Sequence, residues 1–226
     1  MKKLIKKVIV SLFVATVVLL GICITLSYCV KEDNIFRVFK TTEKVEKPEI
    51  EKKFLTPNKY SRPKIALEEV KGIVVHYTGN PGSTAIGNRN YFENLRIKKT
   101  TYASSHFVVG LDGEIIQCLP LDEISYASND RNSDTISIEC CHEDKSGKFN
   151  DKTFESLVEL VAWLCGEYNL TKKDIIRHYD VTGKQCPKYY VKNEEEWKNF
   201  KTEVFEYIDE KKITGSTEAS SESEKE

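Results

Sequence analysis

The sequence lacks an excess of charge of either sign. Its 226 residues contain 34 Lys and Arg against 35 Asp and Glu, so the net charge is −1 and the pI is near 6.5. Nucleic-acid binding usually needs a concentrated basic face, and this balance gives no electrostatic case for a nucleic-acid partner. The chain also has no internal repeat and no glycine-rich loop of the kind that cradles phosphates.

A disulfide framework is missing as well, although the chain has seven cysteines. Two of them lie in an apolar N-terminal segment, and two others, Cys140 and Cys141, are neighbours in one expected strand. None of the spacings is typical of a disulfide-stapled scaffold, and a buried cysteine is otherwise an ordinary small apolar side chain. At this length the chain can form one well-cored domain with appendages, but hardly two domains.

The N-terminal segment has no charge between Val8 and Val30, a run of 23 residues. As a helix it would span about 34 Å, enough for the core of a bilayer. A small-x-small cleavage site is missing, and no small residue precedes Cys23 or Cys29 as a lipoprotein signal would need. We therefore expect residues 1–30 to be a transmembrane signal anchor, with its flanking lysines in the cytoplasm and the rest of the chain outside. Secretion after signal cleavage is the alternative.

The segments on either side of the expected domain are polar. Thirteen of the 23 residues from Lys31 to Lys53 are charged, which predicts a solvated tether over residues 31–53. The last residues, 213–226, are rich in Ser and Glu and are expected to be disordered. The folded domain is accordingly expected over residues 54–212.

Within this domain the pattern alternates between short apolar strands and amphipathic helices. Asp112-Gly113 lies between two strand-like runs and is a strong hairpin signal. Apolar residues at three- and four-residue spacing mark the helices. We therefore expect an α/β fold with a mixed central β-sheet flanked by helices. The expected strands are Lys71–Tyr77, Ser104–Gly110, Glu114–Cys118 and Thr135–Cys141, and the expected helices are Ala85–Arg96, Asp151–Tyr168 and Asn193–Lys212.

The stretch Ile175–Tyr190 combines side chains that bind metals. His178 and Cys186 stand eight residues apart across a loop that contains glycine, and imidazole nitrogen and thiolate sulfur are both ligands of tetrahedral zinc. His76, at the end of an apolar strand, is a third candidate. Two His and one Cys, with a fourth position left to water, is the ligand count of a catalytic zinc site rather than a structural one.

Four segments together resemble the zinc-dependent N-acetylmuramoyl-L-alanine amidases. They read V-V-H-Y-T-G, S-S-H-F-V-V-G-L-D-G-E-I-I-Q, T-I-S-I-E and R-H-Y-D-V-T-G-K-Q-C-P, in that order along the chain. The family also includes phage lysozyme-like amidases and peptidoglycan recognition proteins. The resemblance covers residues Phe54 to Ile208.

The resemblance implies roles for five residues. His76, His178 and Cys186 would be the ligands of a Zn²⁺ ion, Glu139 the catalytic carboxylate and Lys184 the stabiliser of the transition state. Strand alternation already places Glu139 among apolar β residues, where a carboxylate is costly to bury without a partner. A surface glutamate on an edge strand is the alternative for that residue.

The resemblance also names the substrate, which is peptidoglycan. The bond cleaved would be the amide between the lactyl group of N-acetylmuramic acid and L-alanine of the stem peptide. We expect a monomer attached by one pass to the bacterial cell membrane, with the catalytic domain outside the cytoplasm. His106 is expected to be structural rather than a metal ligand, and the loop Tyr126–Asn129 to form one wall of a substrate groove.

Two alternatives remain at this point. A non-catalytic peptidoglycan-binding protein of the same fold would usually lose a metal ligand, most tellingly the cysteine, but Cys186 is present. A Cys–His hydrolase would pair Cys140 or Cys141 with His142 or His106. Neighbouring residues in a strand point to opposite faces, and no nucleophile elbow or helix N-terminus activates either thiol.

Overall fold

The computed structural model describes the backbone of residues 42–222 and the side chains of residues 42–211. The expected membrane anchor, residues 1–30, lies outside the described residues, as does the expected tether before Thr42. Among the helices that are described, none is long and apolar enough to cross a bilayer.

Six strands form one mixed sheet in the order β1-β4-β3-β5-β2-β6. The strands β3, β5, β2 and β6 are parallel, and β4 runs antiparallel to β3. The turn between β3 and β4 passes through Gly113 at a φ of 85°, which confirms the predicted hairpin. The strands are β1 (Glu51–Lys52), β2 (Gly72–Tyr77), β3 (Phe107–Val109), β4 (Ile115–Gln117), β5 (Thr135–Cys140) and β6 (Ile175–Arg177).

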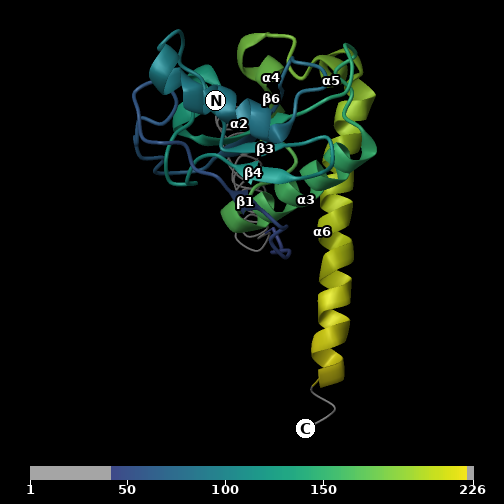
Figure 1. Ribbon diagram of the computed structural model, residues 1–226. Coiled ribbons are helices and arrows are strands. Elements are labelled where there is room, and N and C mark those ends of the chain that lie inside the picture. The colour runs from purple at the N-terminus through teal and green to yellow at the C-terminus, as the bar shows by residue number, and fades with distance from the viewer. Residues whose placement is uncertain (1–41, 223–226) are drawn as a thin grey trace, which may run out of the picture. The chain divides into compact units, whose positions relative to one another are not determined.

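Helices cover both faces of the sheet, with α2 on one side of the strands and α3 on the other (Figure 1). The predicted mixed α/β architecture is therefore confirmed. The helices are α2 (Ala85–Lys98), α3 (Asp151–Tyr168), α4 (His178–Thr182), α5 (Lys188–Lys192) and α6 (Glu194–Glu222), with a 3₁₀ helix η1 (Asn129–Ser133).

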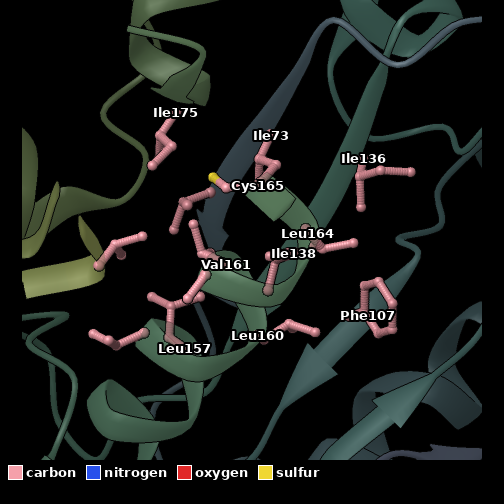
Figure 2. Packing of buried hydrophobic residues seen from close by; sticks show 14 of the residues in the cluster. Ile73, Phe107, Ile136, Ile138, Leu157, Leu160, Val161, Leu164, Cys165 and Ile175 are labelled. Carbon is pink, nitrogen blue, oxygen red and sulfur yellow. The ribbon is translucent and has the colours of Figure 1, made fainter. Parts of the chain in front are cut away.

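The larger core lies between the sheet and α3. Figure 2 shows Ile73 and Ile138 of the strands facing Leu157, Val161 and Leu164 of α3, and all five side chains are at most 1% exposed. Burial of such a side chain contributes roughly 1.5–3 kcal/mol. The helix begins where the sequence predicts, because the side chain of Asn150 accepts a hydrogen bond from the Thr153 backbone N–H (2.9 Å).

A smaller core on the other face packs α2 against the hairpin. Phe92 and Leu119 belong to it, together with Val108 and Ile116 of β3 and β4. Because both faces of these strands are buried, they read as continuous apolar runs rather than as alternating ones. The sheet is thus held from both sides, which fixes the positions of the residues at the ends of its strands.

The expected tether is wrong for the part that the structure describes. Val45 and Ile50 pack against the larger core, and Lys44 forms an ion pair with Glu167 of α3 (2.9 Å). Strand β1 then pairs with β4 at the edge of the sheet. A few apolar residues and an open strand edge are enough to hold a charged segment against the domain. The compact unit therefore begins at Thr42, earlier than the predicted start at residue 54.

The last helix is longer than predicted. It runs to Glu222, whereas the sequence pattern ends it at Lys212 and assigns residues 213–226 to a disordered tail. The apolar stripe does end near Ile208. The helix contains no proline that would interrupt its backbone hydrogen bonds, and they continue beyond Ile208. The short elements β6, α4 and α5 were not predicted, because each is too short to show a periodicity.

Candidate metal centre

Three neighbouring parallel strands bring the candidate residues to one edge of the sheet. His76 lies near the carboxyl end of β2, directly opposite Glu139 of β5. On the other side of β2 lies β6, and His178 follows its last residue. The carboxyl ends of parallel strands in α/β sheets commonly carry the functional groups, because all of them meet at the same edge.

The loop after β6 returns to this edge and places Cys186 beside His76. Arg177, which is 6% exposed, anchors the start of α4 through its guanidinium bonds to Asp180 and to the Tyr190 carbonyl. The loop then closes on itself, because the Tyr179 backbone N–H donates to the carbonyl of Cys186 (2.9 Å). His178 and Cys186, which are eight residues apart in the sequence, thereby come close together in space.

The three predicted ligands form one group. Their ligand atoms all lie within 4.8 Å of one another, and Sγ of Cys186 is 3.8 Å from Nδ1 of His76. Ligand atoms around a tetrahedral zinc are about 3.5 Å apart, so the group needs only a small contraction to hold the ion. Among the described residues, this is the one cluster of His, Cys, Asp and Glu with metal-binding geometry.

Hydrogen bonds determine which imidazole nitrogens face the group. Nε2 of His76 lies 3.1 Å from Oγ of Ser128, and Nε2 of His178 lies 3.0 Å from Oδ1 of Asn129. The amide oxygen can only accept, so Nε2 of His178 carries the proton. Nδ1 of His178 is then a bare acceptor, buried and without a hydrogen-bond partner. A buried, unpaired nitrogen that faces two other ligand atoms fits a metal ion.

Burial sets the protonation of the three groups. It lowers the pKa of His76 well below its usual value, and the charges of His178 and Lys184 act in the same direction. Burial and then Lys184 lower the pKa of His178. Burial, followed by the charge of Glu139, raises the pKa of the Cys186 thiol to about 12. Both imidazoles are therefore neutral, the form that binds metals, and an incoming cation would displace the thiol proton.

Glu139 and Lys184 line the same cleft as the three ligands. Oε2 of Glu139 is buried without a hydrogen-bond partner, whereas Lys184 is exposed at the rim. Burial raises the pKa of Glu139 to about 8, and Lys184 acts in the opposite direction. Glu139 is thus a carboxyl group whose proton is easily exchanged near neutral pH, and it is not the surface glutamate of an edge strand, because β5 lies inside the sheet.

The other histidines and cysteines lie outside this group. His106 is fully engaged, with the Ser137 backbone N–H donating to Nδ1 (3.0 Å) and Nε2 donating to the Glu123 carbonyl (2.9 Å). Both ring nitrogens thus have protein partners, which is typical of a structural histidine. Burial raises the pKa of Cys141 to about 12 and that of Cys140 well above its usual value, so neither thiol is activated as a nucleophile.

Sequence reasoning placed the loop Tyr126–Asn129 on a cleft wall, and Tyr126, Ala127 and Asn129 do line the cleft. It missed the contacts of Ser128 and Asn129 with the two imidazoles. Asn129 has a φ of 53°, and the backbone N–H groups of Ala127 and Ser128 donate to Oδ1 of Asn132. The one available signal was asparagine itself, which tolerates this backbone conformation better than other non-glycine residues.

Fold and site together define a class: mixed α/β proteins in which two histidines and one cysteine form an open group able to hold a metal ion. The chain belongs to the N-acetylmuramoyl-L-alanine amidase family, whose sequence model matches residues 66–189, more than half of the chain.

Similar proteins agree with this assignment. The amidase CwlL of Bacillus licheniformis is 35% identical over 188 residues, which cover 77% of this chain and 51% of CwlL. The amidase BlyA of Bacillus subtilis is 36% identical over 172 residues, or 67% of this chain and 45% of BlyA. This chain therefore spans about half the length of these relatives. A mutant endolysin from Bacillus subtilis, of known structure, is 31% identical with a TM-score of 0.58, covering 69% of this chain and 98% of the endolysin.

Proposed function

We propose that this chain is a zinc-dependent N-acetylmuramoyl-L-alanine amidase. It hydrolyses the amide that joins the lactyl group of N-acetylmuramic acid to L-alanine of the peptidoglycan stem peptide. The observation that carries the proposal is the convergence of three ligand atoms within 4.8 Å at a cleft that Glu139 also lines. Every residue invoked comes from one chain, so the proposal needs only a monomer.

His76 and His178, through their Nδ1 atoms, and Cys186, through Sγ, would hold the zinc ion. Zinc bound there supplies a Lewis acid that polarises the substrate carbonyl and makes water a better nucleophile at neutral pH. All three ligands line the cleft, through which the substrate amide would reach them.

Glu139 takes the proton from the attacking water and delivers it to the leaving nitrogen of L-alanine. A carboxyl group whose pKa lies near neutrality can do both, because it gives up and accepts its proton at little cost. Lys184, at the rim of the same cleft, holds a fixed positive charge toward the oxyanion that forms on the amide carbonyl.

Metal removal tests the proposal directly. The purified full chain is expected to contain close to one zinc per molecule by elemental analysis. A strong chelator should abolish the release of stem peptide from purified cell wall, and added zinc should restore it. Peptide release that continues unchanged in metal-free protein would contradict the proposed function.

The hydrogen bond from His178 to Asn129 gives a second test. We expect Asn129→Ala to weaken zinc binding by about 10–100-fold, the usual cost of removing an outer partner of a ligating histidine. Competition with a chromophoric chelator measures the affinity without using activity. Asn90→Ala, an exposed position on α2, is the matched control and should bind zinc like the parent. Equal zinc affinities of the parent, Asn129→Ala and Asn90→Ala would show that Asn129 does not support the metal site.

We also propose that residues 1–30 anchor the chain in the bacterial cell membrane with the amidase domain outside. The charge-free run of 23 residues and the missing cleavage site support this proposal. Mass spectrometry of the native protein should find residues 1–30 intact, in the membrane fraction. A mature form that begins near Lys31 would instead indicate secretion after cleavage.

A further inference from the structure

Three tyrosines from separate segments pack together beside the cleft. The rings of Tyr60 and Tyr102 stack with their centroids 5.2 Å apart, and Tyr126 meets Tyr102 edge-on at 5.6 Å. Tyr102 and Tyr126 line the cleft, and Tyr102 is 49% exposed although it is a large ring in contact with two others. We call Tyr60, Tyr102 and Tyr126 the tyrosine wall.

Backbone hydrogen bonds join the three segments that carry the wall. The backbone N–H of Ala103 donates to the Tyr60 carbonyl, and that of Ser104 donates to the Tyr126 carbonyl, both at 3.1 Å. The Tyr126 backbone N–H donates in turn to Oγ of Ser104 (2.9 Å). Rigid tyrosines offer a large contact area with little loss of conformational entropy on binding.

The charged side chains of the cleft lie close to the candidate ligands. Among the lining residues, Glu139 is the one Asp or Glu and Lys184 the one Lys or Arg, and both act electrostatically on Cys186. Four other residues that line the cleft are small or apolar. These are Phe92, Ala103, Ser104 and Ala127.

The two parts of the proposed substrate on either side of the scissile amide, the sugar arm and the stem peptide, differ in charge. The carboxyl group of N-acetylmuramic acid is consumed in the scissile amide, so the sugar arm is neutral, whereas the stem peptide carries free carboxylates. A pyranose ring also presents C–H groups on its faces, which pack on aromatic rings, and hydroxyl groups at its edge. Within residues 42–211, the hydroxyl groups of Tyr102 and Tyr126 make no hydrogen bond, so they are available to a sugar.

Resting on the proposed function, we propose that the tyrosine wall is the subsite for the sugar arm of the substrate. It binds N-acetylmuramic acid and the next sugar of the glycan strand, and it thereby places the lactyl amide over the three ligands. The wall acts in substrate binding and takes no part in proton transfer.

Three substrates that share the lactyl–L-alanine amide test this subsite in the full chain. They are a disaccharide-peptide, an N-acetylmuramoyl-peptide and a lactoyl-peptide without sugar. For Tyr102→Ala we expect KM to rise roughly tenfold on the disaccharide-peptide, the scale of truncating one aromatic anchor, with kcat nearly unchanged. On the lactoyl-peptide the variant should match the parent.

Two further variants distinguish the effect of losing the Tyr102 ring from a general disturbance of the fold. Tyr102→Phe keeps the ring and should lose much less than Tyr102→Ala. Tyr91→Ala removes a tyrosine of α2 that is also 49% exposed but does not line the cleft, and it should behave like the parent. An equal loss on the sugar-free substrate, or no loss on any substrate, overturns the subsite.

A binding measurement keeps the subsite testable if the proposed function fails. If the parent cleaves none of the three substrates, the amidase proposal is wrong, and a tetrasaccharide of N-acetylglucosamine then decides the subsite alone. Calorimetry should detect its binding to the parent and a roughly tenfold weaker binding to Tyr102→Ala. Equal binding to both proteins, or none to the parent, overturns the subsite.

Discussion

Cys186→Ala is expected to purify with far less than one zinc per chain and with no measurable amidase activity. Cys186 is 2% exposed and supplies the only sulfur of the group, so its removal leaves two neutral imidazoles. Two histidines alone bind zinc weakly, and the loss should exceed the roughly 10–100-fold cost of changing an outer partner. Elemental analysis and chelator competition measure the metal, and peptide release measures activity.

Cys165→Ala is the matched control for this change. Cys165 is also a free, fully buried thiol, but it lies in α3 and belongs to the larger core. This variant should lose some stability and still carry close to one zinc per chain. Near-stoichiometric zinc in Cys186→Ala would rule out the proposed ligand set, whatever the activity of that variant.

Glu139→Gln is expected to keep its zinc and lose at least about 100-fold in kcat, the usual scale for a general acid–base group. Glutamine has nearly the same shape, but it can neither take a proton from water nor give one to the leaving amine. The amide replaces a carboxyl group of nearly the same size whose Oε2 already lacks a hydrogen-bond partner, so no hydrogen bond of that atom is lost and the fold should change little.

Glu155→Gln is the control for Glu139→Gln, because it makes the same chemical change on the exposed face of α3. It should retain parental kcat and KM. If Glu139→Gln hydrolyses the muramoyl–alanine amide at the parental rate, Glu139 is not the proton carrier, even where zinc content and fold are as proposed.

The sheet and the main helices could be predicted because their patterns are local. Buried parallel strands such as β2 and β5 read as apolar runs, and the stripe of α3 repeats at helical spacing. The three candidate ligands could be predicted for a chemical reason, since histidine and cysteine are few and fit the same ion. Their approach to within 4.8 Å needed the structure, because it depends on β2 and β6 being neighbours.

The surroundings of the site could not be predicted. The hydrogen bonds of the two imidazoles with Ser128 and Asn129 join residues 52 and 49 positions apart, and neither residue type signals such a partner. The same holds for the tyrosine wall, whose three rings come from distant segments. The packing of Val45 and Ile50 was missed because a charged composition hides a few well-placed apolar side chains.

The bond that is cut is the central claim, and mass spectrometry of digested cell wall tests it most directly. Purified peptidoglycan treated with the zinc-loaded full chain should yield free stem peptides that begin with L-alanine, together with glycan strands that keep an intact lactyl carboxylate on every muramic acid. The same products should be missing after chelation and in Glu139→Gln. Shortened glycan strands that still carry their peptides, or peptides cut after L-alanine, would contradict the assignment of this chain as an N-acetylmuramoyl-L-alanine amidase.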